Sequence, residues 1–138
     1  MKKYKLGMVV SEFNYDVTMM MVERAKAEAE FLEVEIAETV MVPGVFEIPL
    51  AVQNLLEKTD VDAVITLGAV ITGETDHDQI VISQASRQIA DLALKYNKPV
   101  SFGVTGPNMT QLQAVDRIEK GRDVVDAAVK MLKRIDRL

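Results

Sequence analysis

Hydrophobic and polar positions follow two periods along the chain, one typical of strands and the other of helices. Short apolar runs predict buried strands, because the strands of a parallel sheet are covered on both faces. Longer stretches repeat apolar residues about every three or four positions, as amphipathic helices do. The predicted strands are Lys5–Ser11, Val34–Val42, Ala63–Gly68 and Val100–Thr105, and the predicted helices are Val17–Leu32, Phe46–Lys58, Asp78–Tyr96, Thr110–Ile118 and a last helix from Gly121 to the C-terminus.

The same pattern predicts which helix faces point inward. In the first helix the apolar positions are Val17, Met20, Met21, Ala25 and Ala29, and the charged residues Glu23, Arg24, Lys26, Glu28 and Glu30 are expected on the outer side. In the third helix the expected inner residues are Ile80, Ala85, Ile89, Leu92 and Ala93. The second strand has a break in its alternation at Glu38. Pro49 falls in the first turn of its helix, where proline is tolerated.

Strands and helices therefore alternate, with short connections and no linker, repeat or low-complexity segment. This order predicts an α/β fold in which right-handed crossovers place helices on both faces of a parallel sheet. We expect one domain spanning residues 1–138, a three-layer α/β/α sandwich whose four-stranded parallel sheet has the flavodoxin-like strand order 2-1-3-4.

Composition narrows the class of protein. The 138 residues include no cysteine, which excludes disulfides and thiolate zinc sites and fits a reducing cytoplasm. The formal net charge of −5 argues against a nucleic-acid partner, so an anionic substrate needs a local positive site. No apolar run approaches the length of about 18 residues that spans a membrane. The segment Met1–Leu6 leads into a strand too soon for a secretory signal.

The turn between the third strand and the third helix is the first candidate site. It holds Gly73, Thr75 and His77, the only histidine of the chain. A glycine and a hydroxyl before a helix offer backbone N–H groups that suit an anion, and a histidine moves protons near neutral pH. The alternative is a plain helix entry capped by Thr75 or Asp76, beside a solvated histidine.

The other turns at the carboxyl ends of the strands add further candidates, because α/β folds bind ligands at that edge. We expect all of them to gather there and to suit a flat polar heterocycle with a hydroxylated tail. The aromatic residues could instead pack in the core, and the glutamate could simply stabilise the first turn of its helix. The candidates are Phe13 and Asn14, Phe46 and Glu47, Val70 and Ile71, and Phe102.

Several other kinds of site are excluded. The chain has no Walker loop and no G-x-G-x-x-G motif. The first strand lacks the phosphate loop of a flavodoxin, and Ser11-Glu12 and Gly68 stand where a response-regulator receiver needs acidic residues. No serine or cysteine nucleophile lies near His77 in the sequence, which makes a catalytic triad improbable.

A set of short motifs runs through nearly the whole chain: Phe13-Asn14, Val42-Pro-Gly-Val-Phe-Glu-Ile-Pro49, Thr66-Leu-Gly-Ala-Val-Ile71, Gly73-Glu-Thr-Asp-His77, Phe102-Gly-Val104, Gln113-Ala-Val-Asp-Arg117 and Lys120-Gly121. In kind and order they resemble the 6,7-dimethyl-8-ribityllumazine synthase family. The resemblance implies a transferase that condenses 5-amino-6-(D-ribitylamino)uracil with 3,4-dihydroxy-2-butanone 4-phosphate in the penultimate step of riboflavin biosynthesis. It implies no cofactor and no metal.

The resemblance also implies roles for single residues. Phe13 stacks on the pyrimidine ring, Asn14, Glu47 and the backbone near Phe46 bind the ribityl hydroxyls, and Ala69, Val70 and Ile71 hold the heterocycle through their backbone. Gly73, Glu74 and Thr75 bind the phosphate, and His77 is the general acid/base. Phe102, Arg117 and Lys120 come from a neighbouring subunit, because the family's active sites lie between the subunits of a pentamer or a multiple of it, up to an icosahedral capsid.

The chain departs from the family pattern at a few positions. Thr72 replaces a common arginine, Asp78 follows the histidine in place of an aromatic residue, and the link from Arg117 to Lys120 is shorter than in many bacterial members. Two alternatives stay open. One is the riboflavin synthase that shares this fold in some archaea, and the other is a flavin-binding or shell-forming protein without turnover.

Overall fold

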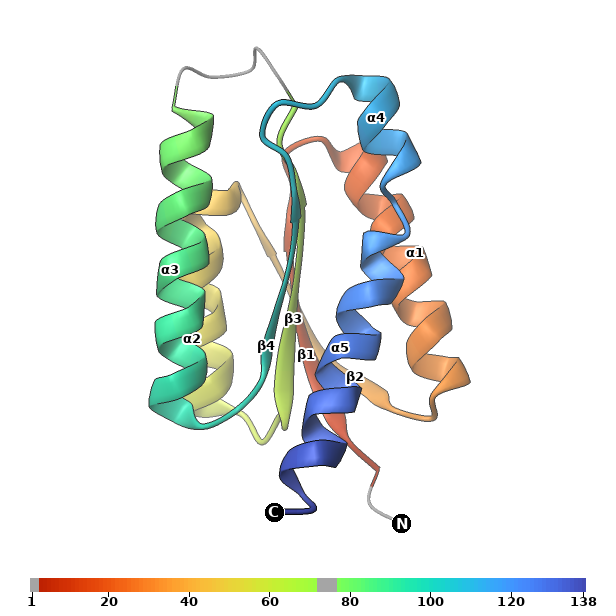
Figure 1. The fold of residues 1–138 in the computed structure, drawn as a ribbon, viewed down its shortest axis with the longest axis vertical. Coiled ribbons are helices and arrows are strands. Elements are labelled where there is room, and N and C mark those ends of the chain that lie inside the picture. The colour runs from red at the N-terminus through yellow and green to blue at the C-terminus, as the bar shows by residue number, and fades with distance from the viewer. Residues whose placement is uncertain (1–2, 72–76) are drawn as a thin grey trace.

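Four parallel strands form the middle layer of a computed structural model that describes residues 3–71 and 77–138 (Figure 1). The strands are β1 (Lys5–Ser11), β2 (Glu35–Val42), β3 (Ala63–Ala69) and β4 (Val100–Thr105). Their order in the sheet is β2-β1-β3-β4, which confirms the expected topology. Because all four run the same way, their carboxyl ends share one edge of the sheet.

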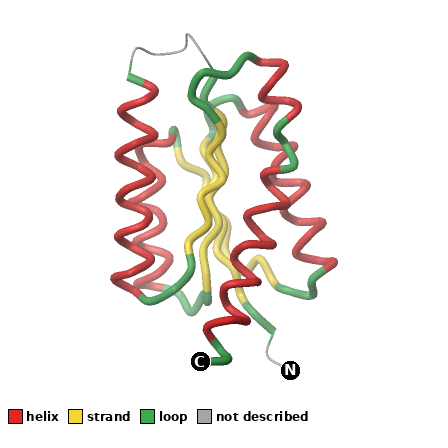
Figure 2. The backbone as a smooth tube through the Cα atoms, in the orientation of Figure 1, coloured by secondary structure: helices red, strands yellow, loops and turns green. Residues whose placement is uncertain are grey.

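Helices cover both faces of this sheet (Figure 2). On one face lie α2 (Ile48–Lys58) and α3 (Asp78–Tyr96), and on the other lie α1 (Tyr15–Phe31), α4 (Gln111–Asp116) and α5 (Lys120–Ile135). The expected helix from Phe46 begins instead with a short 3-10 turn, η1 (Val45–Glu47), and Pro49 falls in the first turn of α2, as expected. No helix in the described ranges has the length and apolar character that crossing a membrane requires.

The two helix layers enclose two hydrophobic cores, one on each face of the sheet. Alternate residues of the central strands serve the two cores: Met8 and Ile65 pack toward α1 and α5, whereas Val9 and Val64 pack toward α2 and α3. All four side chains are fully buried. This alternation follows from the pleat of the strands, and it explains why β1 and β3 are apolar almost throughout.

Two expectations about helix faces were wrong. Ile80 is 63% exposed, and Ile82 is buried instead. Ile82 lies on the same side of the helix as Ala85 and Ile89, whereas Ile80, two positions before Ile82, points to a different side. Glu28, expected on the outer side of α1, is only 8% exposed. It faces α5, where its Oε1 lies 3.4 Å from Nε of Arg122.

Strand β2 is irregular at the position where its alternation breaks. The pairing with β1 shifts from Leu6 opposite Ile36 to Gly7 opposite Glu38, which leaves Ala37 as the extra residue of a bulge. Bulges are common on edge strands, and β2 is an edge of this sheet. The break in alternation at Glu38 therefore lies within one residue of this bulge.

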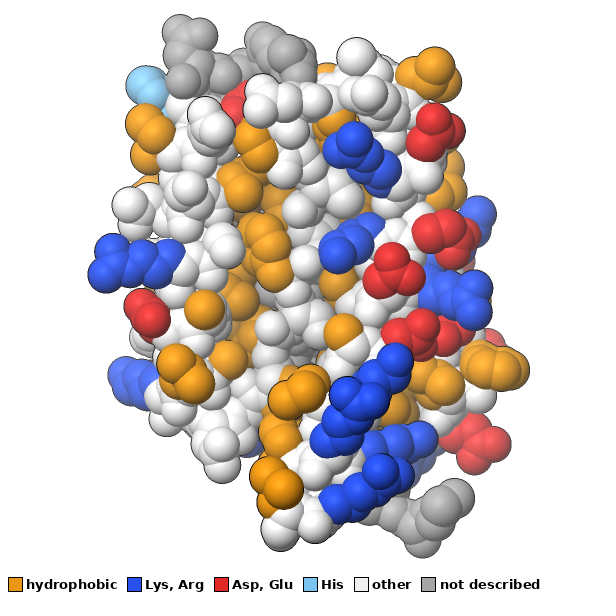
Figure 3. Space-filling view, in the orientation of Figure 1, with side chains coloured by type: hydrophobic (Ala, Val, Ile, Leu, Met, Phe, Trp, Pro, Cys, Tyr) orange, Lys and Arg blue, Asp and Glu red, His pale blue; other side chains and the backbone are white. Residues whose placement is uncertain are grey.

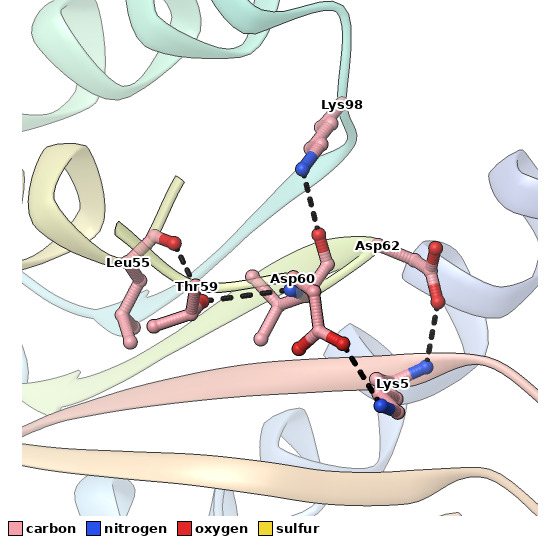
Figure 4. A network of polar contacts seen from close by, with 7 residues as sticks. Lys5, Leu55, Thr59, Asp60, Asp62 and Lys98 are labelled. Carbon is pink, nitrogen blue, oxygen red and sulfur yellow. Dashed lines mark hydrogen bonds and ion pairs between the residues drawn. The ribbon is translucent and has the colours of Figure 1, made fainter. Parts of the chain in front are cut away.

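A polar network fastens the amino end of β3 (Figure 4). The Lys5 backbone N–H donates to Asp62 Oδ2 at 2.8 Å, and Lys5 Nζ donates to Asp60 Oδ2 at 2.9 Å. Lys98 Nζ donates to the Val61 carbonyl at 2.9 Å. These bonds join the start of β3 to β1 and to the segment before β4. They lie at the end of the sheet opposite to the carboxyl edge.

Candidate active site

A pocket of about 170 Å³ lies at the carboxyl edge of the sheet. We call it the aromatic pocket. Its walls come from the turn after β1, the turn after β2, the end of β3 and the first residues of α3. The lining residues are Phe13, Gly44, Val45, Phe46, Ala69, Val70, Asp78 and Val81. Three of the four turns that were expected to converge therefore do so.

The two phenylalanines of this pocket are exposed. Phe13 is 53% exposed and Phe46 is 69% exposed, so neither packs in a core. Both belong to turns at the carboxyl edge rather than to regular strands. Exposed aromatic faces beside a pocket suit stacking on a flat ligand ring. The core-packing alternative for these two residues is thus excluded.

Asn14 connects the turn after β1 to the end of β3. Its backbone is left-handed, with φ 59° and ψ 50°, a conformation that asparagine tolerates better than most residues. Its side-chain Nδ2 donates to the Ala69 carbonyl at 2.8 Å. The carbonyl of Asn14 in turn accepts from the amides of Val17 and Thr18, each at 3.0 Å, at the start of α1.

The backbone at the end of β3 is also held by the chain after β4. The Val70 amide donates to the Thr105 carbonyl at 2.9 Å. Gly106 has a φ of 100°, and a Cβ there would lie 2.3 Å from the Val70 carbonyl oxygen, so only glycine allows this approach. Ile71 is buried and is the last residue of the first described range. The backbone expected to hold a heterocycle is therefore fixed on two sides.

Glu47 is half-buried in η1, directly before α2. Its amide donates to the Gly44 carbonyl at 3.2 Å. Its Oε1 lies 3.4 Å from the position that a Cβ on Gly44 would occupy, so the carboxylate folds back over the turn after β2. This position is compatible both with binding of hydroxyl groups and with a stabilising acid at a helix start.

His77 is exposed and directly precedes α3. Its carbonyl accepts from the Val81 amide at 2.9 Å. It is itself the capping residue of α3, a position that the helix-entry alternative gave to Thr75 or Asp76. The predicted phosphate-binding residues Gly73, Glu74 and Thr75 lie outside the described residues.

Asp78 is a pocket residue that the sequence did not single out for a role. It lines the aromatic pocket, and within the described part of the chain its Oδ1 is buried and has no hydrogen-bond partner. One feature of the sequence could have indicated a role for Asp78: it directly follows His77, at a position where an aromatic residue is common in the family. A polar group in such a position adds a hydrogen-bond acceptor to a pocket with otherwise apolar side chains.

Phe102 and Lys120 lie elsewhere, in a groove of about 520 Å³ between α3 and α5 along the edge strand β4. We call it the β4 groove. Figure 3 shows apolar side chains running down this part of the surface. The expectation that Phe102 lies at the carboxyl edge with the others was wrong for a single subunit. Phe102 pairs with Thr66 in the body of the sheet, three residues before β4 ends.

Arg117 is exposed at the end of α4. Its Nη1 lies 3.6 Å from the sulfur of Met109, which is fully buried beneath it. The predicted residues therefore separate into a group in or beside the aromatic pocket and a group on α4, α5 and β4. The aromatic pocket and the β4 groove have no lining residue in common.

Comparison of the sequence with known proteins shows the family of the chain. The family model for 6,7-dimethyl-8-ribityllumazine synthase matches residues 3–136. A 6,7-dimethyl-8-ribityllumazine synthase from Methanothermobacter thermautotrophicus is 58% identical over 135 residues, which cover 98% of this chain and 97% of the relative. One from Methanobrevibacter smithii is 56% identical over the whole of both chains, and one from Methanocaldococcus jannaschii is 56% identical over 96% of this chain and 94% of its own. The chain belongs to the 6,7-dimethyl-8-ribityllumazine synthase family of enzymes.

Proposed function

We propose that this enzyme condenses 5-amino-6-(D-ribitylamino)uracil with 3,4-dihydroxy-2-butanone 4-phosphate to form 6,7-dimethyl-8-ribityllumazine. An amine of the uracil condenses with the ketone to an imine with loss of one water molecule, phosphate is eliminated, and a second condensation closes the ring with loss of a second water molecule. This is the penultimate step of riboflavin biosynthesis. The observation that carries the proposal is the pair of exposed phenylalanines at the carboxyl edge, in a chain that matches the family almost from end to end.

The aromatic pocket binds the uracil in this proposal. Phe13 stacks on the ring, and backbone groups of Ala69, Val70 and Ile71 hold its polar edge. Asn14 and Glu47, with the backbone near Phe46, bind the ribityl hydroxyls. The support from the structure is that Phe13, Phe46, Ala69 and Val70 surround one pocket while Asn14 and Glu47 belong to its turns. Holding two reactive substrates together accounts for much of the rate enhancement.

The second substrate brings a phosphate, which an acidic chain binds only at a local positive site. Gly73, Glu74 and Thr75 hold it through backbone N–H groups and a hydroxyl, and Arg117 completes the clamp. His77 moves protons during imine formation and ring closure. Its exposed position beside the start of α3 leaves it accessible to substrate.

We further propose that the enzyme acts as a pentamer or a multiple of it, in the cytoplasm, with each active site between two subunits. The division of the predicted residues supports this assembly, because Phe102 and Lys120 line the β4 groove and not the aromatic pocket. A neighbour whose β4 groove faces the aromatic pocket supplies Phe102, Lys120 and Arg117. The groove has mainly apolar side chains along β4, and β4 is an edge strand of the described sheet; both features suit an interface between subunits.

The experiment is incubation of the purified protein with both substrates, with the fluorescence of the lumazine product as the readout. Product formation that requires both substrates supports the proposal. A riboflavin synthase would instead consume the lumazine and release riboflavin, and a binding or shell protein would leave both substrates unchanged. Omitting the butanone phosphate provides the matched control.

A further inference from the structure

The geometry points to Asn14 as a positioning residue that fixes the stacking face of Phe13 against the end of β3, in addition to any contact of its own with substrate. This inference rests on the proposed function, because it concerns the pocket that binds the uracil. It begins from one bond between a turn and a strand end that lie far apart in sequence, the Asn14 Nδ2 to Ala69 carbonyl hydrogen bond of 2.8 Å.

The turn after β1 is tied to β2 on one side of Phe13, where the Glu12 amide donates to the Val42 carbonyl at 2.8 Å, and the Asn14 bond ties its other side to β3. Phe13 is 53% exposed, so burial does not define the position of its ring. Asn14 is half-buried and left-handed, and its carbonyl is committed to the first amides of α1. Its side-chain amide reaches from this turn across to the neighbouring strand β3.

The receiving side of the bond is rigid. Ala69 is the last residue of β3 and is 1% exposed. The next residue, Val70, is tied to Thr105 by its amide and is closely packed against Gly106. The Asn14 bond therefore ties the turn after β1 to a strand end that is fixed by other contacts.

The consequence concerns the two walls between which a flat ring must lie. Phe13 and Val70 both line the aromatic pocket, and they adjoin the two ends of the Asn14 to Ala69 bond. A stacked ring needs an aromatic face at a defined separation from the opposite wall. Loss of the bond frees Phe13 and weakens the binding of the ring itself, whether or not the ligand has a ribityl chain.

The test compares Asn14→Gly, which keeps the left-handed backbone and removes the amide, with Glu33→Gly. Glu33 has the same φ of 59°, just after α1, and lines neither the aromatic pocket nor the β4 groove. Binding is measured by calorimetry for 5-amino-6-(D-ribitylamino)uracil and for 5,6-diaminouracil, which lacks the ribityl chain. We expect Asn14→Gly to weaken both ligands about three- to tenfold, the effect of one lost hydrogen bond, and Glu33→Gly to change neither.

Two further measurements show how Asn14 acts. In a Phe13→Ala background the additional effect of Asn14→Gly on the binding of 5,6-diaminouracil should largely disappear, because a positioning residue acts through the ring that it positions. Hydrogen exchange without ligand, followed by mass spectrometry, should be faster in Asn14→Gly for the peptides that contain Phe13 and Ala69. The same peptides should be unchanged in Glu33→Gly.

Weakening confined to the ribityl ligand, or full additivity with Phe13→Ala, would overturn the positioning role and leave Asn14 as a ligand contact alone. Unchanged hydrogen exchange in Asn14→Gly would overturn it as well. Failure of the proposed function looks different, because the wild-type protein would then bind neither pyrimidine. The exchange experiment contains no ligand and still decides whether Asn14 holds the turn.

Discussion

At the scale of single residues, the exposed rings of Phe13 and Phe46 are the clearest sign of a binding site. Burying a phenylalanine side chain stabilises a fold by about 1.5–3 kcal/mol, and these two rings gain at most part of that. They flank a pocket in which Asp78 and backbone groups are the polar elements. A ligand with a flat ring and polar edges matches both features.

His77 is the residue on which catalysis of the proton transfers is expected to depend. We expect His77→Ala to lower kcat by about 10- to 100-fold without abolishing turnover, because proximity of the two substrates remains. Assembly and uracil binding should survive, since an exposed residue contributes little to stability. Measuring kcat from about pH 5.5 to about pH 8.5 decides the matter. A variant with wild-type kcat and an unchanged pH profile would make His77 a bystander.

Arg117 tests the phosphate site separately. We expect Arg117→Ala to raise the KM of the butanone phosphate by about tenfold or more while the Kd of the uracil changes little, because a guanidinium pairs with phosphate and not with the neutral ring. Inorganic phosphate should compete with the butanone phosphate in the wild-type enzyme and compete less in the variant. Arg122→Ala, which removes a cation that is paired with Glu28, is the matched control. Equal weakening of both substrates would show that Arg117 does not bind the phosphate.

At the scale of elements, hydrophobic periodicity was sufficient to predict the sheet and most of the helices. β1, β4 and α3 have the predicted bounds, because each is a clear apolar run or stripe between turn residues. The short turn η1 was predicted as part of a helix, since its residues do not break the helical pattern. The local pattern predicts these elements because the apolar positions are the ones that become buried, and burial of one face or stripe determines where a strand or helix forms.

The features that the sequence alone did not predict depend on partners from other elements. The sequence of α1 predicts that Glu28 is a charge on the surface. Its partners Arg122 and Asp126 belong to α5, and only the packing of α5 against α1 brings them close to it. Phe102 belongs to a strand that ends at the active edge, but its register with Thr66 places it in the body of the sheet. The bond between Asn14 and Ala69 joins residues 55 positions apart, for which no alternation of apolar residues gives a signal.

Glu28 makes the packing of α1 on α5 dependent on pH. Its pKa is raised above the ordinary value, chiefly because its carboxyl group hydrogen-bonds to Asp126 and secondly because it is buried, while Arg122 partly opposes the shift. The folded protein thus holds this proton more tightly than the unfolded chain does. The group stabilises the fold below its unfolded pKa, and that contribution is lost as the pH rises through its folded pKa.

We therefore expect Glu28→Gln to raise Tm near pH 7 by a few degrees, because the amide keeps hydrogen-bonding capacity without the buried charge. The difference from the wild type should shrink as the pH falls toward about 4, where the wild-type carboxyl group is protonated. Thermal unfolding across this range is the measurement, with Glu30→Gln, an exposed carboxylate of α1, as the control. A difference in Tm that grows at low pH would contradict the argument.

At the scale of the whole molecule, the proposed function divides each active site between two subunits. The aromatic pocket offers stacking faces, and the β4 groove offers Lys120 and Phe102 beside β4, an edge strand of the described sheet. A ring closes when the same heterologous contact repeats around a rotation axis, and every interface then contains one half from each neighbour. The proposed pentamer therefore places one complete site at each of its interfaces.

This arrangement predicts complementation between two impaired variants. His77→Ala damages the half beside the aromatic pocket, and Arg117→Ala damages the half that the neighbour supplies. In mixed rings assembled at equal amounts, about one quarter of the interfaces combine an intact His77 with an intact Arg117 from the next subunit. We expect the specific activity of rings assembled by co-expression to reach about one quarter of the wild-type value, well above either variant alone. Light scattering should show a multiple of five subunits for each sample.

If the two residues served a site within one subunit, every subunit of the mixed rings would lack one of them, and the activity would only average that of the two variants. A monodisperse monomer with wild-type turnover would contradict the shared site altogether.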